Sequence, residues 1–107
     1  MKDNKLMKTL LTLTTFCALI LFAGISMAGS ADAGKQKSSG CVSCHGMNGK
    51  STNPNVPNLA GQKKNYLQKA LTLYRDKKRE DAMMNSLTAS LSDADIDDIA
   101  TYYSSVK

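Results

Sequence analysis

The stretch Cys41-Val42-Ser43-Cys44-His45 decides how the rest of this sequence is interpreted. Its pattern, C-x-x-C-H, is the signature of covalent c-type haem attachment. Two thiols separated by two residues on about one helical turn can reach the two vinyl groups on one edge of a porphyrin and form thioethers. The adjacent imidazole of His45 then points at the iron as its proximal axial ligand. The motif therefore predicts one covalently attached haem c, held by Cys41, Cys44 and His45.

Other uses of a C-x-x-C pair fit this sequence less well. A redox dithiol of the thioredoxin type accompanies a βαβ pattern, and no segment here has the pattern of a strand. A closed zinc site needs four ligands, whereas the chain after residue 28 has two Cys and one His. A disulfide between Cys41 and Cys44 would close a very small loop and stabilise little.

The N-terminal segment has the three-part layout of a secretory signal peptide. Lys2, Lys5 and Lys8 precede an apolar run over residues 10–25, and Ser26-Met27-Ala28 supplies small residues at the −3 and −1 positions. We therefore expect a signal peptide over residues 1–28, a single domain over residues 29–107 and a periplasmic location. This location agrees with the motif, because haem c is attached outside the cytoplasm.

Two alternatives at the N-terminus stay open. The apolar run could remain as a membrane anchor, although it is short of the ~20 apolar residues that a full span needs. A second possible cleavage site is Ala31-Asp32-Ala33. Cys17 lies in the middle of the apolar run, without the motif that precedes a lipid-modified Cys, and we expect it to be lost with the signal.

The composition of the mature part indicates a thin protein core. Cleavage after residue 28 leaves 79 residues without Trp or Phe. It also removes three of 14 basic and one of nine acidic residues, which leaves 11 and eight and a formal net charge of +3. Domains of this size usually need a disulfide, a metal or a cofactor to hold them together. The shortage of large apolar residues is therefore a second argument for a prosthetic group.

Apolar periodicity predicts an all-α domain with one long loop. Helical stripes at i, i+3, i+4 and i+7 occur within residues 62–77 and within residues 92–104, where Ser92 is a natural N-cap. A first helix is expected from about residue 31 into the cysteine motif. Residues 46–61 are rich in turn formers and read as a loop, and residues 82–91 could hold a turn of helix or an extended run.

The order of several short motifs resembles a known family. The pieces are Cys41-Val42-Ser43-Cys44-His45-Gly46, Pro57-Asn58-Leu59-Ala60-Gly61-Gln62, Met83-Met84, Leu91-Ser92-Asp93-Ala94-Asp95-Ile96 and Ile99-Ala100-Thr101-Tyr102-Tyr103. Together they resemble a soluble monohaem class I cytochrome c of the short bacterial type, and also one half of the dihaem members of that class. The resemblance implies the class I fold, with three to four short helices and loops around the haem. Its N-terminal and C-terminal helices would cross near a right angle.

The second axial ligand is expected to be a methionine. The mature chain has no His other than His45, and a Met thioether is typical of electron carriers, where it raises the potential. Met47 stands too close to His45 to reach the opposite haem face. In the family, the ligand stands seven residues before the Leu that opens the last helix. That position is Met84, with Met83 the next candidate.

The resemblance also assigns supporting roles. In relatives a proline carbonyl accepts a hydrogen bond from the proximal His, and Pro57 matches that proline better than Pro54. Gly34 and Tyr103, or Tyr102, are candidates for the helix crossing. A further set is expected to pack on the haem or the helices around it: Leu59, Leu67, Leu71, Ile96 and Ile99.

Basic residues crowd the middle of the chain and bear on its partners. Lys63, Lys64, Lys69, Arg75, Lys77, Lys78 and Arg79 form either a docking surface for an acidic redox protein or an ordinary solvated face. Nucleic-acid binding is not expected, because no interleaved aromatic residues accompany them. We expect a monomer.

Three functions remain to be compared. The first is a non-enzymatic carrier of single electrons between respiratory or dehydrogenase partners. The second is a haem c subunit of a larger dehydrogenase or of an oxidoreductase for sulfur or nitrogen compounds. The third is a sensor or peroxidase-like enzyme with an open sixth site, which the matching Met and the lack of a distal His disfavour.

Overall fold

The computed structural model describes residues 4–5, 7–8 and 28–107. The described part from residue 28 onward is helical and contains no strand. Its elements in chain order are α2 (Ala31–Lys37), η1 (Ser39–Cys41), α3 (Val42–His45), η2 (Met47–Gly49), α4 (Lys64–Arg75), α5 (Ala82–Thr88) and α6 (Asp93–Ser105). The predicted all-α fold is confirmed, although it has five α-helices in this part rather than three or four. The predicted signal peptide lies almost wholly outside the described residues, among which no helix has the length and apolar character to cross a bilayer.

The last helix, α6, begins as the sequence predicts and forms the centre of the core. Ser92 Oγ accepts a hydrogen bond from the Asp95 backbone N–H at 3.1 Å, and the Asp95 carboxylate accepts one from the Ser92 N–H at 2.9 Å. This reciprocal capping box satisfies two of the backbone donors that a helix start leaves without partners. The inward face of α6 consists of Ile96, Ile99, Ala100 and Tyr103, all buried.

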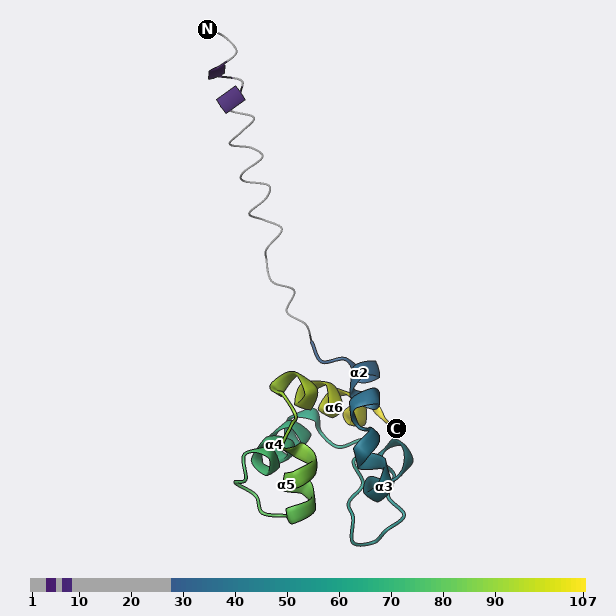
Figure 1. Ribbon diagram of the computed structural model, residues 1–107. Helices are drawn as coiled ribbons and strands as arrows, with labels where there is room; N and C mark the ends of the chain where they lie inside the picture. The colour runs from purple at the N-terminus through teal and green to yellow at the C-terminus, as the bar shows by residue number, and fades with distance from the viewer. Residues whose placement is uncertain (1–3, 6, 9–27) are drawn as a thin grey trace.

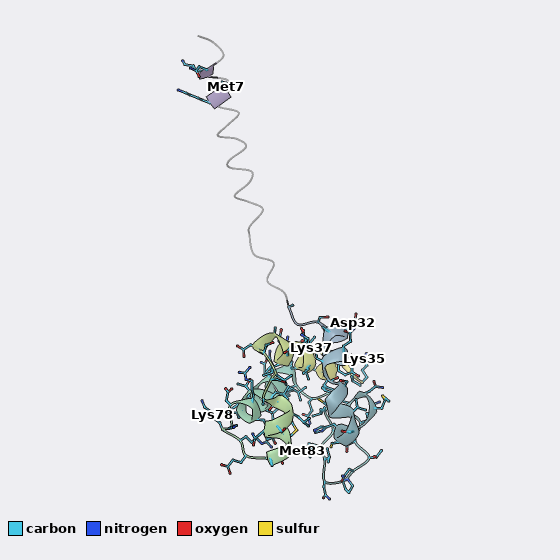
Figure 2. The ribbon with its side chains drawn as sticks, viewed as in Figure 1. Met7, Asp32, Lys35, Lys37, Lys78 and Met83 are labelled. Atoms are coloured by element: carbon cyan, nitrogen blue, oxygen red, sulfur yellow. The ribbon has the colours of Figure 1, made fainter. Side chains whose placement is uncertain are left out.

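Helix α2 packs across α6 with very close backbones (Figure 1). A Cβ atom on Gly34 would lie only 2.0 Å from the Asp98 carbonyl oxygen, so no side chain fits there. The Lys37 ammonium joins the same two helices, at 2.8 Å from Asp95 Oδ1 and 2.7 Å from Asp98 Oδ2. The crossing therefore depends on Gly34, as predicted, and is completed by Lys37 (Figure 2).

The first helix does not continue into the cysteine motif, and this part of the prediction is wrong. Helix α2 ends at Lys37, and a short 3-10 turn at Ser39–Cys41 separates it from α3. Ser38 is buried at the break, where its hydroxyl donates to the Lys35 carbonyl at 2.9 Å. Serine side chains compete for backbone hydrogen bonds and Gly40 is a poor helix former, which together explain the interruption.

The long loop over residues 46–61 folds back onto α6. Gly49, with φ of 75°, accepts hydrogen bonds from the backbone N–H groups of Leu59 (2.8 Å) and Ala60 (3.1 Å). A Cβ on Gly49 would meet the Tyr103 ring at 2.7 Å, so the chain needs glycine there. The Gly61 N–H then donates to the Tyr103 carbonyl at 2.9 Å. Both ends of the loop are thus tied to the last helix.

Helices α4 and α5 form the other wall of the domain. Leu67 of α4 is buried against α6. Arg75, at the end of α4, ties this helix to the start of α6 by donating to Asp93 Oδ1 at 2.7 Å and to the Leu91 carbonyl at 3.3 Å. The segment 82–91, for which the sequence left helix or extended structure open, contains α5. Asp81 caps this helix by accepting from the Met84 N–H at 2.9 Å.

Candidate functional site

A cavity of about 420 Å³ lies between these elements and collects the residues that the sequence singled out. Cys41, Cys44, His45, Pro57, Met83 and Met84 all line it. They come from η1, α3, the long loop and α5, which are up to 43 positions apart in the sequence. The fold therefore brings every predicted haem-binding residue to one place.

His45 is held in a defined orientation at the C-terminal end of α3. Its side chain is buried, and Nδ1 lies 2.8 Å from the carbonyl oxygen of Pro57. Because a carbonyl can only accept, Nδ1 carries the proton and Nε2 keeps a free lone pair for a metal. Pro54 lies in the outer part of the loop and does not line the cavity. Of the two prolines, Pro57 is therefore the one in contact with the histidine.

The two cysteines are free thiols on neighbouring turns at the cavity wall. Cys41 is half-buried, and Cys44 is exposed. Burial raises the pKa of the Cys41 thiol, with the Tyr103 hydroxyl acting in the opposite direction. Two thiols and an imidazole with a free Nε2, all on one cavity, are the donor set that covalent haem binding requires.

Of the methionines, Met84 is the best placed to face the cavity. Its side chain is half-buried, whereas Met83 is 62% exposed at the start of α5 (Figure 2). Met47 is 71% exposed and is absent from the cavity lining, so the structure does not bring it to the site. The Met84 backbone is fixed at both polar groups, because its N–H donates to Asp81 and its carbonyl accepts from Thr88 Oγ1 at 2.7 Å.

Asn85 is a supporting residue that the sequence reasoning missed. Its Nδ2 donates to the carbonyls of Tyr74 (2.7 Å) and Arg79 (2.9 Å), and its Oδ1 accepts from the Asp81 N–H at 3.0 Å. It thereby ties the end of α4 to the start of α5, next to Met84. No spacing or motif in the sequence predicts this role. The only indication is weak: an Asn directly follows a candidate iron ligand.

The rest of the lining is mostly apolar, as haem requires. Leu59, Leu67, Leu71 and Ile99 line the cavity, whereas Ile96 is buried elsewhere in the core. The hydroxyl of Tyr103 is an exception, because it is buried and has no hydrogen-bond partner among the residues that the structure describes. Burial raises the pKa of Tyr103 to about 12, so the hydroxyl keeps its proton. An apolar cavity with these donors at its wall fits haem.

The basic residues are not equivalent in the structure. Lys64 Nζ pairs with Asp97 Oδ1 at 2.7 Å, and Arg79 lies over the Tyr74 ring at 4.7 Å from its centroid and lines the cavity. Arg75 is half-buried and pairs with Asp93, and the other members of the predicted docking set are exposed: Lys63, Lys69, Lys77 and Lys78. Figure 2 shows Lys78 on the connection between α4 and α5, pointing away from the domain.

Comparison with known proteins agrees with this site. The family model described as cytochrome c matches residues 31–107. Cytochrome c-554(548) of Halomonas halodenitrificans is 47% identical over 73% of this chain and 98% of its own length. Cytochrome c4 of Pseudomonas aeruginosa is 43% identical over 84% of this chain and 47% of its own length.

The fold comparison gives the same answer. The crystal structure of reduced recombinant cytochrome c4 from Pseudomonas stutzeri superposes with a TM-score of 0.71 and 40% identity, over 75% of this chain and 47% of that one. This chain thus spans about half the length of the cytochromes c4 that it matches. Together with the C-x-x-C-H motif and the cavity, these matches show that the chain belongs to the cytochrome c family and carries covalently attached haem c.

Proposed function

We propose that this chain is a periplasmic carrier of single electrons and not an enzyme. In this proposal Cys41 and Cys44 form the thioether links, and His45 and Met84 are the axial ligands of the iron. The observation that carries it is that His45 and Met84, from α3 and α5, line one apolar cavity together with both cysteines. When bound, the haem supplies an iron centre that takes up and releases one electron.

The protein's own residues account for the stability of such a centre. Pro57 holds the His45 ring in one tautomer and one orientation, which supports ligation in both oxidation states. The capping bond from Asp81 and the bond from Thr88 fix the Met84 backbone. With both axial positions taken by the protein, no site remains for a substrate, and this favours electron transfer over catalysis or sensing.

Export and partner choice belong to the same proposal. The signal peptide over residues 1–28 would deliver a domain of residues 29–107 to the periplasm, where haem c is attached. The exposed residues Lys63, Lys69, Lys77 and Lys78 would meet an acidic redox protein, since opposite charge speeds encounter. We propose that the carrier acts as a monomer between respiratory or dehydrogenase partners.

A second candidate is a haem c subunit of a larger oxidoreductase complex. One relative, from Thiomonas intermedia, is named "thiosulfate dehydrogenase electron acceptor" and is 35% identical over 94% of this chain and 45% of its own length. Co-purification of this chain with a larger catalytic chain would favour the subunit over the free carrier.

Visible spectroscopy tests the proposed carrier and its ligands. The oxidised protein should be low-spin, with the weak far-red band of a Met-ligated haem, and the reduced protein should not bind carbon monoxide. Met84→Ala should abolish the band and admit carbon monoxide, because the sixth position opens. Met83→Ala is the matched control and should leave both properties unchanged. Rapid carbon monoxide binding by the unaltered protein would refute the carrier, and an effect confined to Met83→Ala would move the ligand to Met83.

A further inference from the structure

Among the buried side-chain nitrogen and oxygen atoms of the described residues, the hydroxyl of Tyr103 is the one without a hydrogen-bond partner. The residue is 1% exposed, and its hydroxyl has no hydrogen-bond partner among the described residues. A buried donor without an acceptor destabilises a fold, so native structures rarely retain one without a reason. The ring alone would fill the same space if Phe stood there. We therefore expect the hydroxyl to have a hydrogen-bond acceptor in the haem-bound protein.

The surroundings of this hydroxyl limit what that acceptor can be. Cys41 packs against the cluster that contains Tyr103. The neighbouring groups that affect the ionisation of Tyr103 are the Ser38 hydroxyl, the Cys41 sulfur and Tyr102. Ser38 Oγ makes no hydrogen bond with the Tyr103 hydroxyl, and the Ser38 proton is directed at the Lys35 carbonyl. The Cys41 sulfur, in contrast, must settle into a fixed position when its thioether forms. It lies near enough to the hydroxyl for each group to affect the ionisation of the other, although the two make no hydrogen bond before the thioether forms.

We propose that Tyr103 tunes the bound haem, by donating its hydroxyl hydrogen bond to the Cys41 sulfur at the attachment edge. The inference rests on the proposed haem ligation through Cys41. A donor proton directed at the Cys41 sulfur places partial positive charge beside the haem. That charge disfavours the oxidised form, which carries one more positive charge, and so raises the reduction potential. The group keeps its proton at neutral pH, so the effect is constant there.

Replacing Tyr103 by Phe removes this hydroxyl and keeps the ring. At a fixed solution potential near the midpoint, the ratio of reduced to oxidised Tyr103→Phe protein should fall by a factor between about two and ten, the range of an ordinary hydrogen bond. Tyr102→Phe is the matched control. Its hydroxyl lies outside the cavity and donates to Asn48 Oδ1 at 2.9 Å, so the ratio should not change. The spectra of both variants should keep the Met-ligated form.

The outcomes separate the two proposals. A lower potential in Tyr103→Phe alone, with an unchanged spectrum, supports the tuning role. An unchanged potential in Tyr103→Phe overturns it, because the hydroxyl would then have no effect on the haem. An equal fall in both variants also overturns it, because the effect would then not be specific to the Tyr103 hydroxyl. A protein without a c-type haem spectrum before any substitution would instead overturn the proposed function itself.

Discussion

Asn85 shows how a single side chain supports the ligand proposed beside it. Three hydrogen bonds tie it to the backbones of Tyr74, Arg79 and Asp81, across a connection that is otherwise exposed. The same connection contains Lys77 in a left-handed conformation, with φ of 56°. We therefore expect the position of Met84 in the cavity to depend on Asn85, a residue that does not line the cavity.

Asn85→Ala should loosen this connection and weaken methionine ligation. Two backbone carbonyls and one N–H lose their partner, and we expect a loss of about 1–3 kcal/mol in the free energy of unfolding. On heating the oxidised protein, the far-red band should disappear below the temperature at which far-UV circular dichroism reports unfolding. Ser86→Ala, at an exposed neighbouring position on α5, is the control and should keep the two temperatures together. Coincident losses in Asn85→Ala as well would show that the tie does not govern ligation.

At the scale of elements, the helices differ in how far the sequence determines them. Helix α6 was predictable, since its cap, its acidic first turn and its buried stripe are all local signals. The stripe of α4 was likewise visible, but its end at Arg75 depends on the turn around Lys77. Helix α5 has seven residues, too few to display a period, and contacts from distant residues stabilise it. The only sequence indication of the break at Ser38 is that Ser38, Ser39 and Gly40 are weak helix formers.

The same contrast holds for the site. The cysteine motif could be predicted from residue types alone, because covalent attachment requires two thiols and an adjacent imidazole, whereas Pro57 and Met84 were expected only from the resemblance to class I cytochromes c. The contribution of Asn85 could not, since it consists of hydrogen bonds to backbone atoms of residues six and 11 positions away. The orphan hydroxyl of Tyr103 is likewise visible only when the packing is known. Hydrogen bonds from a side chain to distant backbone atoms cannot be predicted from the composition or the residue pattern.

The pairing of α2 with α6 should make the fold acid-sensitive. The side-chain hydrogen bond from Lys37, followed by the Ser92 backbone N–H, lowers the pKa of Asp95 to about 2. Lys37 is also the first cause of the lowered pKa of Asp98, ahead of the Ser30 N–H. A carboxylate with a depressed pKa stabilises the fold above its ordinary pKa, given as 3.8, and loses that contribution as the pH falls toward the folded-state value. Stability should therefore decline from about pH 4 to about pH 2.

Lys37→Gln should flatten this acid limb. Without the ammonium the two carboxylates titrate closer to their ordinary pKa, so the melting temperature depends less on pH in that window and is lower near neutrality. Lys35→Gln, on the same helix and without an ion pair among the described side chains, is the control and should keep the profile. Thermal unfolding at a series of pH values measures both. Parallel profiles for all three proteins would show that Lys37 does not couple the helices.

At the scale of the whole molecule, the haem is expected to be part of the core. The described residues bury only Leu67, Ile96, Ile99, Ala100 and Tyr103 as a hydrophobic core, which is little for a domain of this length. Without the haem, the apolar lining of a cavity of about 420 Å³ would face water and lose its packing partner. The sequence's lack of large apolar residues and the size of the cavity thus have one explanation.

The double substitution Cys41→Ser and Cys44→Ser should therefore leave a chain that does not hold this fold. Without the thioethers the haem is no longer retained, so the hydrophobic surface of α4, α5 and α6 around the cavity loses its partner. We expect much weaker far-UV helical signal and no cooperative thermal transition at room temperature or above. Ser43→Ala, at the exposed position between the two cysteines, is the matched control and should retain haem, helical signal and cooperative melting. A haem-free double variant with unchanged helical signal and melting temperature would show that the protein core is sufficient by itself.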